Sequence, residues 1–194
     1  MTTRQFPKYL IGLTGSIASG KSVVLAGFAA LGAYTISADE LVHELYQRQR
    51  VRQQLERWFG SADRATVAKA VFNSSVARKQ VEQFLHPQVW QLALRYLAAS
   101  PKRWAVFEVP LLFEAGWENR TDLTLLVVAD PKTLSVRLKE RGLSRAAYEK
   151  RRRTQLSDAE KMKRADIVLF NNGSKQALQN KLKRLYEIFQ TLYV

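Results

Sequence analysis

The sequence predicts an α/β fold in which a five-stranded parallel sheet carries helices on both faces. Apolar runs of strand length alternate along the chain with segments whose apolar residues recur every three to four positions. The longest runs, 104–109 and 123–129, are apolar almost throughout, as strands covered on both faces are. Residues 40–98 show only helical patterns, which predicts a helical insertion into this sheet.

The individual elements follow in chain order. Residues 9–13 form an apolar run typical of a buried strand, and a helix is expected from Gly20 to about Ala30. A short second strand is expected at 33–36, after a stop signal at Leu31-Gly32. The remaining expectations are a helix at 40–58 that ends at Phe59-Gly60, helices within 64–98, strands at 104–109 and 123–129, helices from 137 to about 164, a strand at 167–170 and a helix at 175–192.

Composition limits the class of protein. A chain of 194 residues with 46% hydrophobic residues can bury a full core, and we expect a single domain. Its sheet-forming core is predicted at about 1–39, 99–131 and 165–194, interrupted by the insertion at about 40–98 and a basic region at about 132–164. The absence of cysteine excludes disulfides and thiolate metal sites. Because the sequence shows no signal peptide or long apolar run, we expect a cytoplasmic protein that does not bind membranes.

The net charge of +14 is concentrated in one segment. Residues 132–164 contain twelve lysines and arginines against four acids. Such a segment attracts polyanionic substrates and neutralises phosphoryl oxygens, although a solvated basic helix face is the simpler alternative. Tyr148 is the one aromatic residue in this stretch. A nucleic-acid-binding surface would interleave stacking aromatics with its basic residues, so we expect no nucleic-acid partner.

The most informative motif is Gly15-Ser-Ile-Ala-Ser-Gly-Lys-Ser22, which fits the phosphate-binding loop G-x-x-x-x-G-K-[ST] between a strand and a helix. Its glycines allow a tight turn whose N–H groups face an anion, and the helix adds its positive end. Lys21 is expected to reach the β- and γ-phosphates, and Ser22 to bind Mg²⁺. The alternative is a turn that binds nothing. The residues expected to contact ATP here are Gly15, Ser16, Ile17, Ala18, Ser19, Gly20, Lys21, Ser22 and Val23.

Polar residues just after the strands are further site candidates, because parallel sheets bind ligands beyond the carboxyl ends of their strands. Asp39 follows the second strand and is placed to accept or align the proton of an acceptor hydroxyl, or to cap a helix starting at Glu40. Glu108 ends the third strand and is a second candidate Mg²⁺ ligand, or a buried, paired acid. Asn171 follows the last strand, where an Asn can pair with an adenine edge or form an ordinary Asn-Gly turn.

Over nearly its whole length the chain resembles the dephospho-coenzyme A kinases. The Leu-His-Pro and Pro-Leu-Leu-x-Glu segments at this spacing are far more specific to that family than the phosphate loop. The segments that carry the resemblance are 11–22, 28–32, Ala38-Asp39, Phe59-Gly60, Arg64 with Val71-Phe72, Leu85-His86-Pro87, 109–114, 137–141, 151–155 and 165–171.

The resemblance implies roles for particular residues. Asp39 matches the catalytic acid near the acceptor 3′-hydroxyl, Arg137 and Arg141 match a lid at 132–164 that closes over the transferring group, and Asn171 matches the adenine contact. The alternative for His86, which precedes Pro87, is that it only caps a helix or packs in the core. The alternative for Arg137 and Arg141 is that they form a solvated pair one helical turn apart. The positions that match the acceptor side are Asp39, Arg64, Leu85, His86, Pro110, Leu111, Leu112 and Glu114.

The implied fold is that of a P-loop NTPase similar to the nucleoside monophosphate kinases, with a helical substrate-binding insertion and a lid. The implied reaction is phosphorylation of the 3′-hydroxyl of dephospho-coenzyme A by ATP and Mg²⁺, the last step of coenzyme A synthesis. We expect a monomer whose partners are these small molecules. The alternatives are a P-loop kinase for a nucleoside or nucleoside monophosphate, against which Leu85-His86-Pro87 argues, and a basic nucleic-acid-binding P-loop protein.

Four residues depart from the family pattern. Ser16 and Ala18 stand where the loop usually has glycine, but neither is one of the two glycines that the motif requires, so phosphate binding is expected to survive. Ser37 replaces an acid two residues before Asp39, and Phe170 stands where the family often has Asp. These departures bear on substrate affinity more than on the type of reaction.

Overall fold

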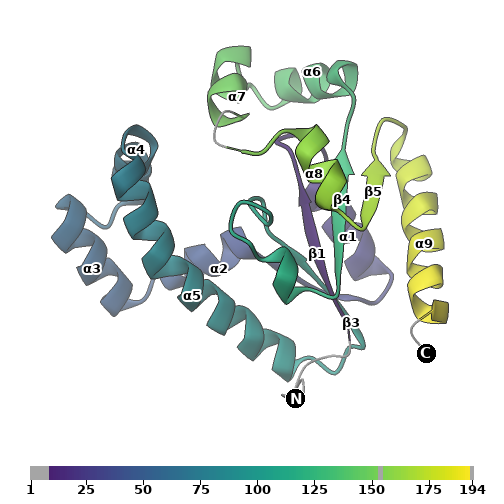
Figure 1. Ribbon diagram of the computed structural model, residues 1–194, viewed down its shortest axis with the longest axis horizontal. Helices are drawn as coiled ribbons and strands as arrows, with labels where there is room; N and C mark the ends of the chain where they lie inside the picture. Colours follow the sequence, from purple (N-terminus) through teal and green to yellow (C-terminus); the bar gives the residue numbers. More distant parts are fainter. Residues whose placement is uncertain (1–8, 153–154, 193–194) are drawn as a thin grey trace. The chain divides into compact units, whose positions relative to one another are not determined.

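The structure is a computed structural model that describes residues 9–152 and 155–192 (Figure 1). Residues 1–8 and 193–194 of the predicted core and Arg153-Thr154 of the predicted lid lie outside the described residues. The chain divides into two compact units. The first consists of Met1–Ile36 and Ser100–Val194, and the second of Ser37–Ala99.

The first unit is built on a five-stranded parallel sheet, which confirms the predicted fold class. β1 pairs with β3 on one side and β4 on the other, with Leu13 in register with Glu108 and Leu125. All residues of β3 are buried, which explains its uninterrupted apolar pattern. The strands are β1 (Tyr9–Gly15), β2 (Tyr34–Ser37), β3 (Trp104–Glu108), β4 (Leu123–Val128) and β5 (Ile167–Phe170), in the order β2-β3-β1-β4-β5.

One face of the sheet is covered by α1 (Lys21–Ala30) and α9 (Lys175–Leu192), which pack against each other. Ile11 and Leu13 point from β1 toward these helices, since alternate residues of a strand share a face. Phe28 of α1 is fully buried there and stacks on Phe189 of α9 with ring centroids 6.4 Å apart. This core holds the start of α1, and with it the end of the phosphate loop, against the sheet.

The loop after β3 and the helix α8 (Asp158–Arg164) lie on the other face. Gly12, between Ile11 and Leu13 of β1, faces Leu112, and a Cβ at Gly12 would lie 3.0 Å from that side chain. Trp117, just before the short 3₁₀ helix η1 (Glu118–Arg120), stacks on Phe107 at 5.9 Å. The residues after β3 are therefore packed against the sheet rather than extended into solvent.

Two helices follow β4 and extend beyond its carboxyl end (Figure 1). They are α6 (Pro131–Glu140) and α7 (Arg145–Arg152). The expected helix start at 137 is wrong, because α6 begins six residues earlier. Asp130 caps this helix by accepting a hydrogen bond of 2.7 Å from Thr133 N, and Pro131 occupies its first turn, where a missing N–H costs nothing.

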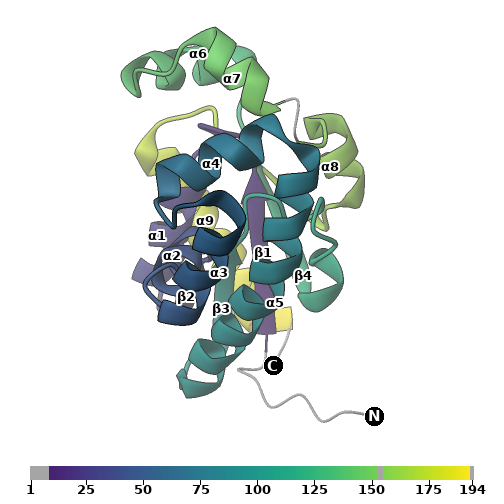
Figure 2. The same ribbon diagram turned by 90° about the vertical axis from the view of Figure 1, so that its left-hand side faces the viewer.

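Within Ala38–Ala99 the second unit consists of helices joined by short connections (Figure 2). A single helix over 40–58 was expected, but the structure has a break between Leu45 and Gln49. The six-residue step from Leu45 to Val51 would rotate the apolar face of a continuous helix by about 120°, and the break lets both residues stay buried. The helices are α2 (Ala38–Leu45), α3 (Gln49–Phe59), α4 (Arg64–Asn73) and α5 (Ser75–Ala99).

The helix α5 is the longest of the described helices, with 25 residues, and contains Pro87 in its interior. One side of α5 is buried against α2 and α4 through residues such as Leu85 and Val89. Nowhere in residues 9–152 and 155–192 does a helix combine the length and the hydropathy needed to cross a bilayer.

Candidate active site

The phosphate loop occupies residues Gly15 to Ser22, between β1 and α1, as the motif predicts. Both glycines of the motif are required by close approaches. A Cβ at Gly15 would lie 2.3 Å from Val127 O, and a Cβ at Gly20 would lie 2.2 Å from the Asn171 side-chain nitrogen. Gly20 also has φ +103, a conformation that L side chains rarely adopt.

The start of α1 is suited to an anion. Its N-cap residue is Gly20, which supplies no side-chain acceptor, and its first turn contains no acidic residue. The first-turn N–H groups and the helix dipole therefore favour a negatively charged ligand. Lys21 lies over the loop, with its Nζ donating to Gly15 O at 2.7 Å and to Ser16 O at 3.1 Å. A lysine in this position adds a positive charge beside the same N–H groups.

Arg137 and Asn171 hold the loop from outside. Arg137 donates through Nη1 to Ser19 O at 2.9 Å and to Ala18 O at 3.4 Å, and through Nη2 to Asn171 O at 3.0 Å. Asn171 is 5% exposed, and its Nδ2 donates to Ser19 O at 2.8 Å. Arg137 is therefore not half of a solvated arginine pair, whereas Arg141, which follows α6, is exposed. A contact of Asn171 with adenine stays a prediction.

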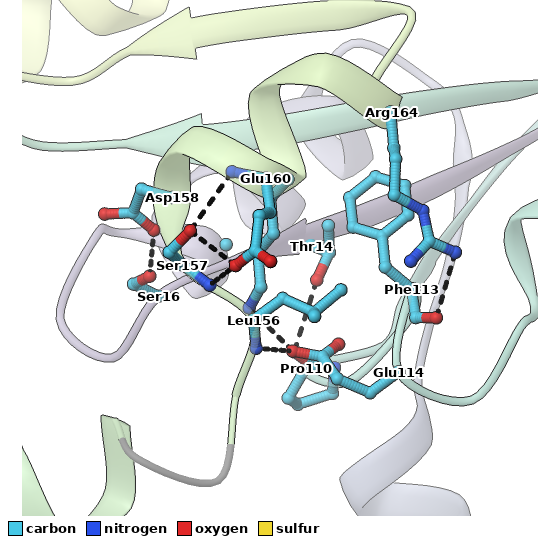
Figure 3. Close-up of polar contacts among 12 residues, drawn as sticks. Thr14, Ser16, Pro110, Phe113, Glu114, Leu156, Ser157, Asp158, Glu160 and Arg164 are labelled. Carbon is cyan, nitrogen blue, oxygen red and sulfur yellow. Dashed lines mark hydrogen bonds and ion pairs between the residues drawn. The ribbon is translucent and has the colours of Figure 1, made fainter.

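A polar cluster around the first turn of α8 joins the phosphate loop to the loop after β3 (Figure 3). The Ser16 hydroxyl donates to Asp158, the first residue of α8. Thr14 at the end of β1 donates to Pro110 O at 3.2 Å. Glu114 Oε1 accepts from Leu156 N at 2.9 Å and lies 3.1 Å from Lys161 Nζ.

These contacts involve Pro110 and Glu114. The sequence predicts that Glu114 and the Pro110-Leu111-Leu112 segment face the acceptor. Leu112 is fully buried, and Glu114 is paired with Lys161, whose side chain is also fully buried. Removing one partner of a buried ion pair leaves an uncompensated charge and is strongly destabilising. Glu114 is thus engaged by the protein itself, and acceptor binding by it stays a prediction.

The two candidate Mg²⁺ ligands belong to neighbouring parts of this unit. Ser22 is exposed in the first turn of α1, and Glu108 is the last residue of β3, next to Leu13 of β1. A hydroxyl and a carboxylate are oxygen donors of the kind that Mg²⁺ prefers, and the ion usually completes its shell with waters and substrate phosphates. Within the described ranges, no group of three or more His, Cys, Asp or Glu residues is placed to hold a metal ion by itself. The donor set therefore fits an ion that arrives with the nucleotide.

The second unit carries the other predicted residues. Asp39 is exposed in the first turn of α2, and the cap of that helix is Ser37, so the interpretation of Asp39 as an N-cap is wrong. Arg64, the first residue of α4, lies 3.1 Å from His43 Nδ1 and over the Tyr46 ring, 5.7 Å from its centroid. Burial raises the pKa of Tyr46, while the Arg64 charge opposes that rise.

Leu85 and His86 lie in the middle of α5. Leu85 is buried in the core of the second unit, whereas His86 is half-buried. Because eleven residues of α5 precede His86, this residue does not cap the helix. Packing and substrate binding stay open as its role.

Sequence reasoning missed three features of the first unit. Asp130 was not recognised as a cap, although Asp-Pro before an apolar helix pattern is a recognised start signal. The spacing Ser157-x-x-Glu160 would have placed the start of α8, because it forms a capping box there. No sequence signal indicates that Lys161 is buried, since its partner Glu114 lies in another part of the chain.

The sequence of the chain is similar to those of known proteins. It matches the dephospho-CoA kinase family over residues 9–177. It is 38% identical to the dephospho-CoA kinase of Thermus thermophilus over 181 residues, covering 90% of this chain and 88% of that protein. It is 35% identical to the dephospho-CoA kinase of Syntrophotalea carbinolica over 189 residues, covering 91% of this chain and 90% of the relative.

Solved structures give the same result. The crystal structure of the Thermus thermophilus protein TT1252 superimposes with a TM-score of 0.84 at 36% identity, covering 93% of this chain and 97% of the other. Dephospho-CoA kinase from Campylobacter jejuni gives a TM-score of 0.68 at 27% identity, covering 93% and 96%. Shikimate kinase from Acinetobacter baumannii, with a TM-score of 0.53 at 12% identity over 96% and 95% of the two chains, shares the fold. The chain belongs to the dephospho-CoA kinase family.

Proposed function

We propose that this protein transfers the γ-phosphoryl group of Mg²⁺-bound ATP to the 3′-hydroxyl of dephospho-coenzyme A, the last step of coenzyme A synthesis. Its membership of the dephospho-CoA kinase family supports the acceptor. The assignment of ATP as the phosphoryl donor rests on the phosphate loop. Its glycines, Lys21 and the helix start without a side-chain cap are arranged for a polyphosphate.

The protein acts mainly by positioning and charge, because the transition state of phosphoryl transfer is loose and leaves little covalent chemistry to the enzyme. Lys21 exchanges its carbonyl partners for the β- and γ-phosphates when ATP binds. Ser22, with Glu108 as a second ligand, would hold Mg²⁺, which when bound neutralises charge on the phosphoryl oxygens. Asp39 aligns the acceptor hydroxyl and takes its proton.

The contacts of Arg137 favour a division of labour between the two lid arginines. Its guanidinium binds three backbone carbonyls, including that of Ser19, so we assign it to holding the phosphate loop. The exposed Arg141 is the better candidate to neutralise the transferring group when the lid closes. The family resemblance assigns acceptor binding to Arg64, Leu85 and His86, and also to Pro110, Leu111, Leu112 and Glu114.

The test is a competition between acceptors. Purified protein with Mg²⁺ and ATP is given equal concentrations of dephospho-coenzyme A, AMP, CMP and adenosine, and ADP and the phosphorylated products are measured. Dephospho-coenzyme A is expected to react far faster, because binding energy from the rest of that molecule orients its 3′-hydroxyl. Faster turnover of AMP or CMP than of dephospho-coenzyme A would show that the protein is a nucleotide kinase instead. Tight RNA binding without turnover of any acceptor would show that it is a nucleic-acid-binding protein.

We further propose that the protein works as a cytoplasmic monomer on these two small-molecule substrates. Sedimentation of the purified chain at several concentrations tests the monomer: a single species near the chain mass of 22.2 kDa is expected. A concentration-dependent increase in mass would contradict it.

A further inference from the structure

The hydrogen bond from Ser16 to Asp158 connects the phosphate loop to a helix far away in the sequence (Figure 3). Ser16 is the second residue of the loop and is only 7% exposed. Asp158 is the first residue of α8, which forms the last part of the predicted lid region before β5. Both residues belong to the first unit, so the contact lies within one compact body.

The contact completes the fixation of Ser16. Its carbonyl oxygen already accepts from Ser19 N at 3.2 Å and from Lys21 Nζ at 3.1 Å. The hydroxyl is the one polar group of the Ser16 side chain. A buried hydroxyl without a hydrogen-bond partner carries the full free-energy penalty of its lost hydration. Asp158 supplies that partner and restrains the loop in the conformation that the backbone contacts define.

Asp158 is itself held in place by its neighbours along α8. Ser157 and Glu160 form a capping box at the start of the helix. Two residues before Asp158, Leu156 N donates to Glu114 at 2.9 Å, and three residues after it, Lys161 pairs with the same carboxylate at 3.1 Å. At the far end of α8, Arg164 donates to Phe113 O at 3.1 Å. The carboxylate of Asp158 is thus presented to the loop from a rigid support.

We propose that Asp158 is a positioning residue of the kinase reaction, which acts through the Ser16 hydroxyl to hold the phosphate loop ready for ATP. Preorganised loops bind more tightly because less ordering remains to be done when the ligand arrives. The carboxylate also has an opposing effect, since its negative charge disfavours a nearby polyphosphate. The proposal states that the hydrogen bond outweighs this repulsion. It rests on the nucleotide-binding part of the proposed function and not on the identity of the acceptor.

The experiment is a double-mutant cycle read by Mg²⁺-dependent ADP binding in calorimetry, with KM for ATP and kcat measured in parallel. Asp158→Ala leaves the Ser16 hydroxyl buried without an acceptor and is expected to weaken ADP binding about tenfold. Ser16→Ala removes the hydroxyl itself and should weaken it several-fold. The double variant should be no worse than Asp158→Ala, because both changes remove one interaction. KM for ATP should rise more than kcat falls, and KM for dephospho-coenzyme A should stay within about twofold.

Asp158→Asn separates the hydrogen bond from the charge. Asparagine keeps an acceptor oxygen and loses the negative charge, so ADP affinity equal to or above that of the wild type is expected. If Asp158→Ala fails to fold, ADP binding is compared for Ser16→Ala, Asp158→Asn and the variant that combines them. Because Asp158→Asn keeps the acceptor oxygen, Ser16→Ala should weaken ADP binding in its presence as it does in the wild type. An unchanged ADP affinity of Ser16→Ala in both backgrounds would overturn the proposal.

Asp166→Ala is the matched control. This aspartate follows α8 and accepts from Thr124 N at 2.7 Å and from Thr124 Oγ1 at 2.6 Å, at the start of β4 and away from the phosphate loop. It should lower the melting temperature without changing ADP affinity. Wild-type or tighter ADP binding by folded Asp158→Ala would overturn the proposal, as would additive effects of the two alanine substitutions. A wild-type protein that binds ADP but phosphorylates another acceptor would overturn only the proposed function.

Discussion

Gly20 combines two constraints that a single substitution can test. It has φ +103, and a Cβ at this position would lie 2.2 Å from the Asn171 Nδ2 atom. Gly20→Ala therefore introduces backbone strain of about 1–3 kcal/mol. It also forces Asn171 away from Ser19 O, which costs about 1–3 kcal/mol for a buried group that loses its partner. We expect a loss of about 2–6 kcal/mol in the free energy of unfolding.

Gly32 provides a control with the same strain and no clash. Its φ is +96, and a Cβ there would meet nothing within 4 Å. Gly32→Ala should cost only the strain, about 1–3 kcal/mol, and should leave the phosphate loop intact. The change in unfolded-state entropy when glycine becomes alanine is common to both variants and cancels in the comparison.

Urea denaturation of the two variants gives the difference in stability, and calorimetry with ADP and Mg²⁺ gives the effect on the loop. Gly20→Ala should be the less stable variant and should bind ADP at least tenfold more weakly, whereas Gly32→Ala should bind as the wild type does. Equal stability and equal ADP affinity of the two variants would show that the approach of Asn171 to Gly20 does not shape the loop.

Three further predictions concern charge. Lys21→Ala should lower kcat by about 10²- to 10³-fold while Lys175→Ala, an exposed lysine at the start of α9, changes nothing; normal turnover by folded Lys21→Ala would refute the phosphate-loop mechanism. Asp39→Asn should lower kcat at least 10²-fold with little change in melting temperature, because the residue is exposed and does not cap α2; an unchanged rate would remove Asp39 from the mechanism. The hydrogen bond from Thr66 N lowers the pKa of Asp63 below its ordinary value of 3.8, so its stabilisation is present above that pH and is lost as the pH falls through the lowered pKa. Melting temperatures between pH 6 and 3 should therefore fall less steeply for Asp63→Asn, which still caps α4 but does not titrate, and an identical slope would contradict the assignment.

The fold could be predicted because its signals are local. The strands at 104–108 and 123–128 are almost continuous apolar runs, the strand at 167–170 is a continuous one, and α9 coincides with the expected 175–192. The predicted helix boundaries were wrong where a capping contact or a change of the buried helix face decides the boundary. The early start of α6 depends on the Asp130 side chain, and the break before α3 depends on keeping Val51 buried.

The phosphate loop could also be predicted, but what holds it could not. Its motif specifies the glycines and Lys21 within eight consecutive residues. The partners of its carbonyl and hydroxyl groups, Arg137, Asp158 and Asn171, come from three other elements, and their contacts depend on tertiary packing. The family resemblance predicts ligand contacts for Arg137 and Asn171, which stay predictions, and the structure adds backbone partners within the protein for both residues.

These partners explain how a loop rich in backbone dipoles can face a polyanion. The carbonyl oxygens of Gly15, Ser16, Ala18 and Ser19 all accept hydrogen bonds, and two of the donors are the cations Lys21 and Arg137. A carbonyl that is already bound to a cationic donor is turned away from the ligand and has its partial negative charge compensated. When Lys21 turns to the phosphates, Arg137 still compensates the carbonyls of Ala18 and Ser19, and the Lys21 charge and the N–H groups at the start of α1 favour an anion. We therefore expect the arginine and the asparagine outside the motif to contribute to phosphate affinity through the loop carbonyls that they bind.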